Sequence, residues 1–128
     1  MRDYRQYQLW QQSHELVRSV YRATERFPKN ELYSLTSQVR RAACSIPMNV
    51  AEGCGKSTDV DFARFLDISA GSASELDYQL LLSRDLGFLD DHAYGQLSTE
   101  LSEIRRMLTV LIQRVRQEPA SHREKANR

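Results

Sequence analysis

Residues 51–58 read AEGCGKST, and the interpretation of this stretch decides the fold. Its ending resembles the phosphate-binding loop G-x-x-x-x-G-K-[ST], which follows a buried β-strand and precedes a helix. Counting back from Gly55 places Val50 where the first glycine of that loop belongs. Valine is β-branched and resists the positive φ that such a turn needs. The stretch is therefore interpreted as a corner between two helices rather than as a nucleotide site.

The residues before this corner have the spacing of one helix face. Steps of three and four residues relate Leu32, Leu35, Val39, Ala42, Ile46, Asn49 and Gly53. Pro47 lies within the segment and predicts a kink, because proline removes a backbone donor. Asn49 is interpreted as a buried polar residue that fixes the helix register. Gly53 and Gly55 are predicted to end the helix.

The residues after the corner have a second helical pattern. Ser57, Thr58 and Asp59 can cap a helix, and the apolar or small positions that follow are Phe62, Leu66, Ser69, Ala73, Leu76, Leu80 and Ser83. The run ISAGSAS at 68–74 has unusually small side chains. Gly71 in mid-helix costs about 1 kcal/mol relative to alanine, so we expect a neighbouring helix to pack closely there.

Two more amphipathic segments flank this pair, so the chain is expected to contain four helices at about 4–26, 31–53, 58–86 and 90–117. Short connections between such helices predict an all-α fold, an antiparallel up-down-up-down four-helix bundle that forms one domain over residues 1–117. Pro119 is expected to end the last helix. Residues 118–128 have no apolar face and are predicted to be a disordered basic tail.

The charges of the 128 residues are segregated along the chain, although the net charge is only +1. Lys and Arg outnumber Asp and Glu by nine to five in residues 1–56 and by seven to two in residues 104–128, whereas residues 57–103 hold ten acidic and two basic side chains. Cys44 and Cys54 are interpreted as reduced thiols. No apolar run is long enough to span a bilayer, and the opening residues have no apolar signal segment, so we expect a cytoplasmic protein without a membrane partner.

Three stretches resemble a known family: LWQQSHELVRSVYRATERFP at 9–28, SQVRRAACSIPMNVAEGCGK at 37–56 and FARFLDISAGSASELDYQLLLSRDLGFL at 62–89. The chain is similar to the four-helix-bundle proteins encoded within intervening sequences of bacterial large-subunit ribosomal RNA genes, also labelled S23 ribosomal protein-like. The middle stretch is the most specific, and it departs from the family pattern only at Val50, where the family has isoleucine.

The resemblance implies a bundle that assembles into a closed ring of five copies, a cyclic homopentamer. It also implies similarity to the accessory protein of diversity-generating retroelements, a pentameric barrel whose basic surface binds nucleic acid and a reverse transcriptase. No enzymatic activity and no cofactor are attached to the family. A partner protein and RNA or DNA are therefore the partners that the resemblance adds to self-association.

The distribution of charge and of exposed apolar residues can be compared with what a ring of copies requires. An acidic third helix facing a basic helix of the next copy would fix the register of a head-to-tail ring; the alternative is that it pairs with basic neighbours in its own bundle. Phe65 and Leu82 lie off the seam of the third helix, and with Trp10 they are candidates for the oligomer interface. The alternative is a wide stripe that faces the core of the same chain.

A nucleic-acid surface is the second hypothesis. Arginine suits phosphate because its planar guanidinium matches two phosphate oxygens, and the candidate residues are Arg40, Arg41, Lys56, Arg64, Arg105 and Arg106. Ion pairs with Glu52 or with carboxylates of the third helix are the competing interpretation. The sequence alone indicates no aromatic platform for single strands.

Catalytic patterns are absent from the sequence. His14, His92 and His122 fall in separate elements without metal-ligand spacing, and no nucleophile–base set is evident. The sequence therefore predicts a non-enzymatic binding or scaffold protein without metal or cofactor. The alternative function is an accessory protein that binds RNA or DNA through basic surfaces of the ring.

Overall fold

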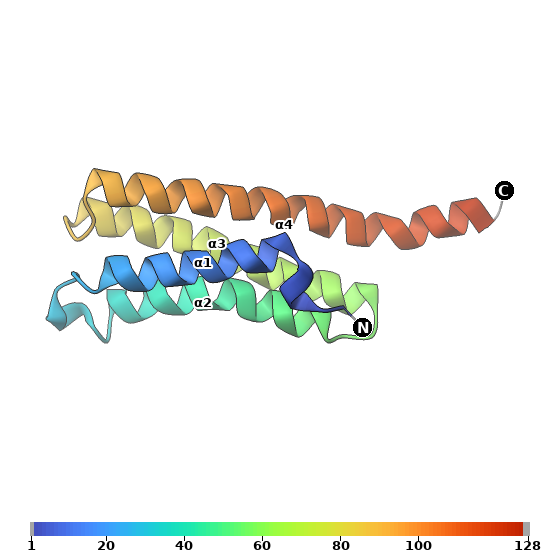
Figure 1. The fold of residues 1–128 in the computed structure, drawn as a ribbon, viewed down its shortest axis with the longest axis horizontal. Helices are drawn as coiled ribbons and strands as arrows, with labels where there is room; N and C mark the ends of the chain where they lie inside the picture. The colour runs from blue at the N-terminus through green and yellow to red at the C-terminus, as the bar shows by residue number, and fades with distance from the viewer. Residues whose placement is uncertain (1, 127–128) are drawn as a thin grey trace.

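The structure, a computed structural model, describes the backbone of residues 2–126 and the side chains of residues 2–117. Four α-helices account for most of this part of the chain: α1 (Gln8–Thr24), α2 (Leu35–Cys54), α3 (Asp59–Asp85) and α4 (Asp91–Ala126). Two short 3-10 helices, η1 (Tyr4–Gln6) and η2 (Lys29–Glu31), precede α1 and α2, and the described residues contain no strand. Figure 1 shows the α1–α2 and α3–α4 connections at one end of the bundle and the α2–α3 corner at the other. The predicted all-α four-helix fold is confirmed.

Several helix ends differ from the predicted bounds for local reasons. α1 begins at Gln8 because Asp3 caps the separate turn η1 through the backbone N–H of Arg5. α2 begins at Leu35 because the Ser34 hydroxyl accepts from the Leu35 N–H. Leu32 therefore precedes the helix and is exposed, so its predicted place in the seam is wrong. The backbone of α4 continues through Pro119 to Ala126, so the predictions that the helix ends at residue 117 and that Pro119 ends it are wrong.

Residues 118–128 form the predicted tail. The structure describes none of their side chains, and residues 127–128 lie outside the described part of the chain altogether. The disorder of this tail stays a prediction.

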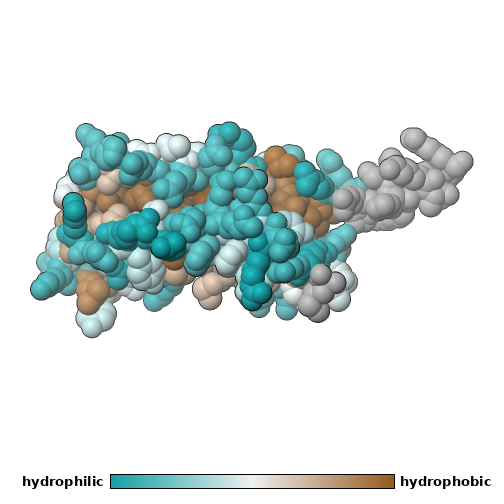
Figure 2. Space-filling model, viewed as in Figure 1, coloured by the Kyte–Doolittle hydropathy of each residue, from teal (hydrophilic) through white to brown (hydrophobic). Residues whose placement is uncertain are grey.

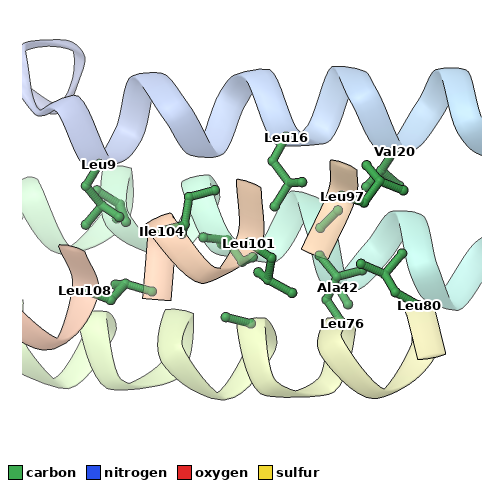
Figure 3. Close-up of a cluster of buried hydrophobic side chains, with 14 of the residues drawn as sticks. Leu9, Leu16, Val20, Ala42, Leu76, Leu80, Leu97, Leu101, Ile104 and Leu108 are labelled. Atoms are coloured by element: carbon green, nitrogen blue, oxygen red, sulfur yellow. The ribbon is translucent and has the colours of Figure 1, made fainter. Parts of the chain in front are cut away.

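The core is formed by the faces that the helical spacing predicts. Beyond Leu35, the seam of α2 is buried at Val39, Ala42 and Ile46, and all seven seam positions of α3 are buried. Figure 3 shows Leu16 and Val20 of α1, Leu76 and Leu80 of α3, and Leu97, Leu101 and Ile104 of α4 directed into one cluster. Each fully buried leucine contributes about 1.5–3 kcal/mol relative to an exposed one. The bundle is thus held by one continuous apolar core.

A polar layer crosses from α2 to α3 on either side of Pro47, which is buried within a continuous α2. The Ser69 hydroxyl donates to the Ile46 carbonyl at 2.9 Å, and the hydroxyls of Ser45 and Ser72 lie 2.7 Å apart. Half-buried Asn49 donates to the Ser45 carbonyl at 2.8 Å and to the Ser45 hydroxyl at 2.9 Å. The Ser69 and Ser72 bonds cross between the helices and fix the α2–α3 register, because a shift of one residue would leave these polar groups unpaired. Both Asn49 bonds stay within α2, so its role in fixing the register stays a prediction.

The α2–α3 corner is a close helix contact, with no strand before it. α2 ends at Cys54, between the two glycines that were predicted to end it, and Gly53 lies in its last turn. A Cβ at Gly53 would lie 3.0 Å from Cδ1 of Phe62 and 3.0 Å from Cβ of Phe65, so only glycine lets α3 approach this closely. Gly55 is the residue that caps α2, with its N–H donating to the Glu52 carbonyl at 3.1 Å. The Thr58 hydroxyl then caps α3 by accepting from the Asp61 N–H. The helix–corner–helix interpretation of AEGCGKST is confirmed.

Gly53→Val should lower the free energy of unfolding by about 1–3 kcal/mol, because the added methyl groups overpack the contact with buried Phe62. Gly55→Val is the matched control. Gly55 has φ −80° and a built Cβ there meets its nearest neighbour at 3.4 Å, an ordinary contact, so its change should stay within about 0.5 kcal/mol. Urea unfolding followed by circular dichroism measures both. Equal losses in the two variants would contradict the close-contact role of Gly53.

Candidate functional site

The six basic residues proposed from sequence fall in three separate places. Arg40 and Arg41 lie in the first half of α2, Lys56 and Arg64 flank the α2–α3 corner, and Arg105 and Arg106 lie in α4. Charge segregation along the chain therefore does not gather these side chains into one basic site.

Arg40 links α1 to α2. Its Nε donates to the Thr24 hydroxyl at 2.8 Å, Nη2 donates to the Tyr21 carbonyl at 3.4 Å, and the guanidinium lies 4.5 Å from the centre of the Tyr21 ring. These three contacts hold one face of the guanidinium on α1. Arg40 is thus first a structural residue, although its charge remains at the surface.

Arg41 is exposed and makes no hydrogen bond or ion pair with any residue that the structure describes. It lies at a cavity of about 370 Å³ between α1 and α2, here called the Tyr33 groove, which is lined by Tyr21, Leu32, Tyr33, Thr36, Ser37, Arg40, Arg41 and Cys44. Tyr33 is 93% exposed. An exposed ring and a cation without a partner thus share one concave surface.

A second cavity of about 310 Å³ continues along the same pair of helices. This Trp10 groove is lined by Tyr4, Trp10, His14, Val17, Cys44, Pro47, Met48 and Ala51. The Trp10 ring stacks on the His14 ring with centroids 5.1 Å apart, and Tyr4 meets its edge at 4.9 Å. Cys44 lines both grooves, so the two form one surface, the α1–α2 groove. Sequence analysis did not identify this row of aromatic residues, because its members are far apart along the chain.

Lys56 and Arg64 both lie over one aromatic ring. The Lys56 ammonium is 5.1 Å and the Arg64 guanidinium 4.6 Å from the centre of the half-buried Phe65 ring. Arg2, which sequence reasoning did not select, donates to the Lys56 carbonyl at 3.0 Å and pairs with Asp59. The Lys56 side chain thus packs at the corner, and Arg2 ties the N-terminus to it.

The acidic helix α3 is paired within its own chain. Arg105 and Arg116 of α4 contact Asp77 and Asp67. The remaining carboxylates of α3 have partners too, in the pairs Asp59–Arg2, Asp61–Arg64, Glu75–Gln79 and Asp85–Arg84. Arg106 pairs with Glu103 along α4. The contacts in the structure therefore agree with the alternative that the acidic helix pairs with basic residues of its own chain. Each such surface pair contributes only about 0–1 kcal/mol to stability.

The three residues proposed for an oligomer interface lie on different surfaces. Trp10 lies in the α1–α2 groove, Phe65 packs beside Gly53, and Leu82 lies on the outer side of α3. All three are half-buried, and Trp10 and Leu82 pack against the core of the same chain. The structure does not bring them together.

The outer face of α3 has an exposed apolar line with a glycine at its middle. Ile68 is 43% and Tyr78 62% exposed, and both lie within one or two turns of Gly71. A Cβ at Gly71 would meet no atom within 4 Å. The close neighbour expected at Gly71 is thus absent from the described part of the chain.

Further hollows lie between α1 and α4. Figure 2 shows hydrophobic surface between these helices, interrupted by hydrophilic side chains. One cavity of about 280 Å³ includes Arg22, Arg26, Asp90 and Glu100 among its lining residues. Another, about 350 Å³, includes Leu9, Glu103, Arg106, Met107 and Val110. Both of these contain carboxylates, which distinguishes them from the α1–α2 groove.

The chemistry available in these hollows is limited. Among the described residues, no group of three or more His, Cys, Asp or Glu side chains is arranged to hold a metal ion. Cys44 and Cys54 are free, and burial raises the pKa of the Cys54 thiol, which disfavours the reactive thiolate. Of the helices described, none combines the length and the hydropathy that a bilayer crossing requires.

Arg40→Ala should lower the free energy of unfolding by about 1–2 kcal/mol, because hydrogen bonds that involve a charged group are lost at a partly buried position. Arg41→Ala removes the neighbouring charge, but no intrachain hydrogen bond or ion pair is lost with it. The free energy of unfolding should therefore change by less than about 0.5 kcal/mol. Thermal and urea unfolding of both variants measure the difference. Equal stabilities would mean that Arg40 does not tie α1 to α2.

Glu100→Gln should stabilise the protein at pH 7. Burial raises the pKa of the Glu100 carboxyl, and the Ser19 hydroxyl and Arg22 only partly oppose this effect. When the folded state has the higher pKa, the protonated carboxyl favours folding at pH values below the pKa of glutamate in the unfolded chain, about 4.3. This stabilisation is lost as the pH rises through the pKa of Glu100 in the folded chain. The gain over wild type should therefore disappear near pH 3.5. Exposed Glu103→Gln serves as control, and an unchanged stability of Glu100→Gln across this range would contradict the burial effect.

Comparison with known proteins places this geometry in a family. The model of the 23S rRNA-intervening sequence protein family matches residues 5–110. A crystal structure of a protein with unknown function from the S23 ribosomal protein family of Bacteroides thetaiotaomicron is similar in fold, with a TM-score of 0.74 and 24% sequence identity over 81% of this chain and 97% of that chain. No curated protein matches the sequence. Since the family model spans the bundle from η1 to the middle of α4, the chain belongs to the 23S rRNA-intervening sequence protein family.

Proposed function

We propose that this protein is a non-enzymatic, cytoplasmic binding or scaffold module, an antiparallel up-down-up-down bundle that self-associates through the outer face of α3. The assembly that the family resemblance implies is a closed ring of five copies. The described residues contain hollows, exposed aromatic rings and paired surface charges, but no arrangement of nucleophile, base and anion-stabilising donors. Such a surface suits binding better than chemistry.

Gly71 is the observation that carries this proposal. A glycine in the interior of a 27-residue helix costs about 1 kcal/mol relative to alanine. Nothing within the described chain approaches it closely enough to explain the missing side chain. A helix from another copy would explain it, because small residues let two helix backbones come close together.

The surroundings of Gly71 fit a helical partner. Steps of three and four residues relate the positions of this face: Arg64, Ile68, Gly71, Glu75, Tyr78 and Leu82. Exposed Ile68 and Tyr78 lie on either side of the glycine, and the charged residues Arg64 and Glu75 alternate with them along the same face. The spacing is that of a coiled-coil seam.

A closed ring requires a second, different surface on each copy. The hollow between the start of α1 and α4 is suited to this role, since Met107 and exposed Val110 provide apolar contact area. Arg106 and Arg114 lie at its rim and would face Glu75 of the neighbouring α3. Intrachain pairs already occupy most carboxylates of α3, so the apolar contact rather than charge would supply most of the affinity.

An accessory role in binding RNA or DNA is the second candidate function. The observation that favours it is Arg41, an exposed guanidinium without an intrachain partner beside the exposed Tyr33 ring. Arg40 adds charge at the same place, whereas the other four basic candidates pair with carboxylates or cover Phe65.

Substitutions at Gly71 should separate folding from assembly. Gly71→Ala removes the helix cost and should raise the free energy of unfolding of the single chain by up to about 1 kcal/mol. Gly71→Gln should reduce self-association at least tenfold, because a long side chain prevents close approach of a second helix. Light scattering after gel filtration measures the mass, and dilution series measure the dissociation constant.

Gly95→Gln is the matched control, since Gly95 is also an exposed helical glycine with no neighbour within 4 Å of a built Cβ. It should leave the assembly unchanged. A single chain at micromolar concentration in the wild type, or equal masses for wild type and Gly71→Gln, would overturn the proposed interface.

A further inference from the structure

We propose that the α1–α2 groove binds single-stranded nucleic acid, with an unpaired base stacked on Tyr33 and its phosphate bound by Arg41. This inference rests on the second candidate function above and names its ligand, an unpaired strand, and its site, which is a different surface from the outer face of α3. It is carried by four properties of the groove: its charge, its aromatic rings, an unpaired hydroxyl at its floor and its continuity.

The groove is electrostatically suited to an anion. None of the residues that line its two cavities is Asp or Glu, although the hollows between α1 and α4 contain such residues. The Tyr33 groove itself is lined by two arginines, Arg40 and Arg41, and by no acidic side chain. An anionic strand would therefore meet cations here without displacing a carboxylate.

Arg41 is the phosphate-binding residue of this arrangement. Its guanidinium has no competing partner within the described chain, so its donors are available to two phosphate oxygens at once. Arg40 is held at the Thr24 hydroxyl and over the Tyr21 ring. It supplies a second positive charge beside Arg41, held in place by its contacts with α1.

Tyr33 is the stacking residue. A tyrosine ring that is 93% exposed covers almost nothing in its own chain. Base–aromatic stacking contributes about 1–3 kcal/mol per base and needs an unpaired base, because both faces of a base in a duplex are covered. Exposed Leu32 and Tyr21 extend the apolar surface next to this ring.

Thr36 provides an independent sign that something polar belongs in the groove. It lines the Tyr33 groove and is only 3% exposed, and its hydroxyl is buried without a hydrogen-bond partner among the described residues. Such an unpaired group costs roughly 1–3 kcal/mol. Its oxygen is itself buried, so a sugar hydroxyl or base edge would satisfy it only after a lining side chain moves aside, whereas an apolar side chain of a protein partner would not satisfy it at all.

The continuity of the groove favours a strand over a single nucleotide. The Tyr33 groove of about 370 Å³ has the volume of a small-ligand pocket. It continues through Cys44 into the Trp10 groove, where Trp10, Tyr4 and His14 present further rings. These three rings pack on one another as one cluster, so a strand that stacks on Tyr33 would meet a second aromatic surface farther along the groove.

Fluorescence anisotropy of labelled 20-nucleotide single strands of RNA and of DNA tests the proposal, with uridine monophosphate as competitor. Tyr33→Ala should weaken binding by about 5–150-fold, the equivalent of one lost stacking contact. Arg41→Ala should reduce the slope of log K against log salt by about 0.7, the value for one phosphate contact on a single strand. Trp10 is the only tryptophan of the chain, so quenching of its fluorescence on titration would place the strand in the groove.

Arg18→Ala and Leu86→Ala are the matched controls, an exposed arginine on α1 and an exposed apolar residue at the end of α3, neither of which lines the groove or belongs to the proposed assembly surfaces. Both should bind strands like the wild type. If uridine monophosphate binds as tightly as a 20-nucleotide strand, the ligand is a free nucleotide, and the proposal that the groove binds a strand is overturned.

Absence of binding at low salt, or equal losses in the groove variants and the controls, would overturn the site. So would a loss of assembly mass in Tyr33→Ala, since the groove would then hold a second copy. Masses measured on the same samples keep the two proposals separate: if the groove fails while the wild-type assembly persists, the proposed function stands.

Discussion

The close approach of α2 and α3 is the constraint on which the rest of the fold depends. Glycine at position 53 lets the aromatic rings of Phe62 and Phe65 lie against the end of α2. Hydroxyl groups of Ser69 and Ser72 then meet α2 beside Pro47. A corner of a few residues can join two long helices only if they pack at this short distance along their length. The apolar faces of α1 and α4 close over the pair that results.

Helical spacing was sufficient to predict this architecture because core burial in a bundle follows sequence period directly. Spacing could not tell why a particular glycine is present. Gly53 and Gly71 are both helix-interior residues, yet one is required by a phenylalanine of the same chain and the other faces open space. That distinction depends on which element lies opposite, and only the packed structure provides it. The prediction that Leu32 belongs to the seam was wrong for a similar local reason, because the Ser34 cap places the start of α2 at Leu35.

The candidate sites were less predictable than the fold. Charge counts along the chain predicted a basic and an acidic surface, but arginines of α4 lie beside carboxylates of α3 and neutralise much of that contrast. Of the adjacent arginines at 40 and 41, one is bound to α1 and the other is unpaired. Helix spacing places these neighbours about 100° apart, and the sequence does not reveal which of them has a partner. The aromatic series of the groove was missed because it joins residues of η1, α1, the η2–α2 loop and α2.

Self-association and strand binding would reinforce each other in a ring. If the outer face of α3 is used for assembly, the α1–α2 groove stays free in every copy, and a ring of copies presents the same groove repeatedly. Binding of one segment of a long strand would then raise the effective concentration of the next segment at a neighbouring groove. A contact of one base and one phosphate is weak in a single copy, but avidity multiplies it by powers of ten without any new interaction. A protein built in this way needs no deep pocket, which agrees with the shallow hollows that the bundle presents.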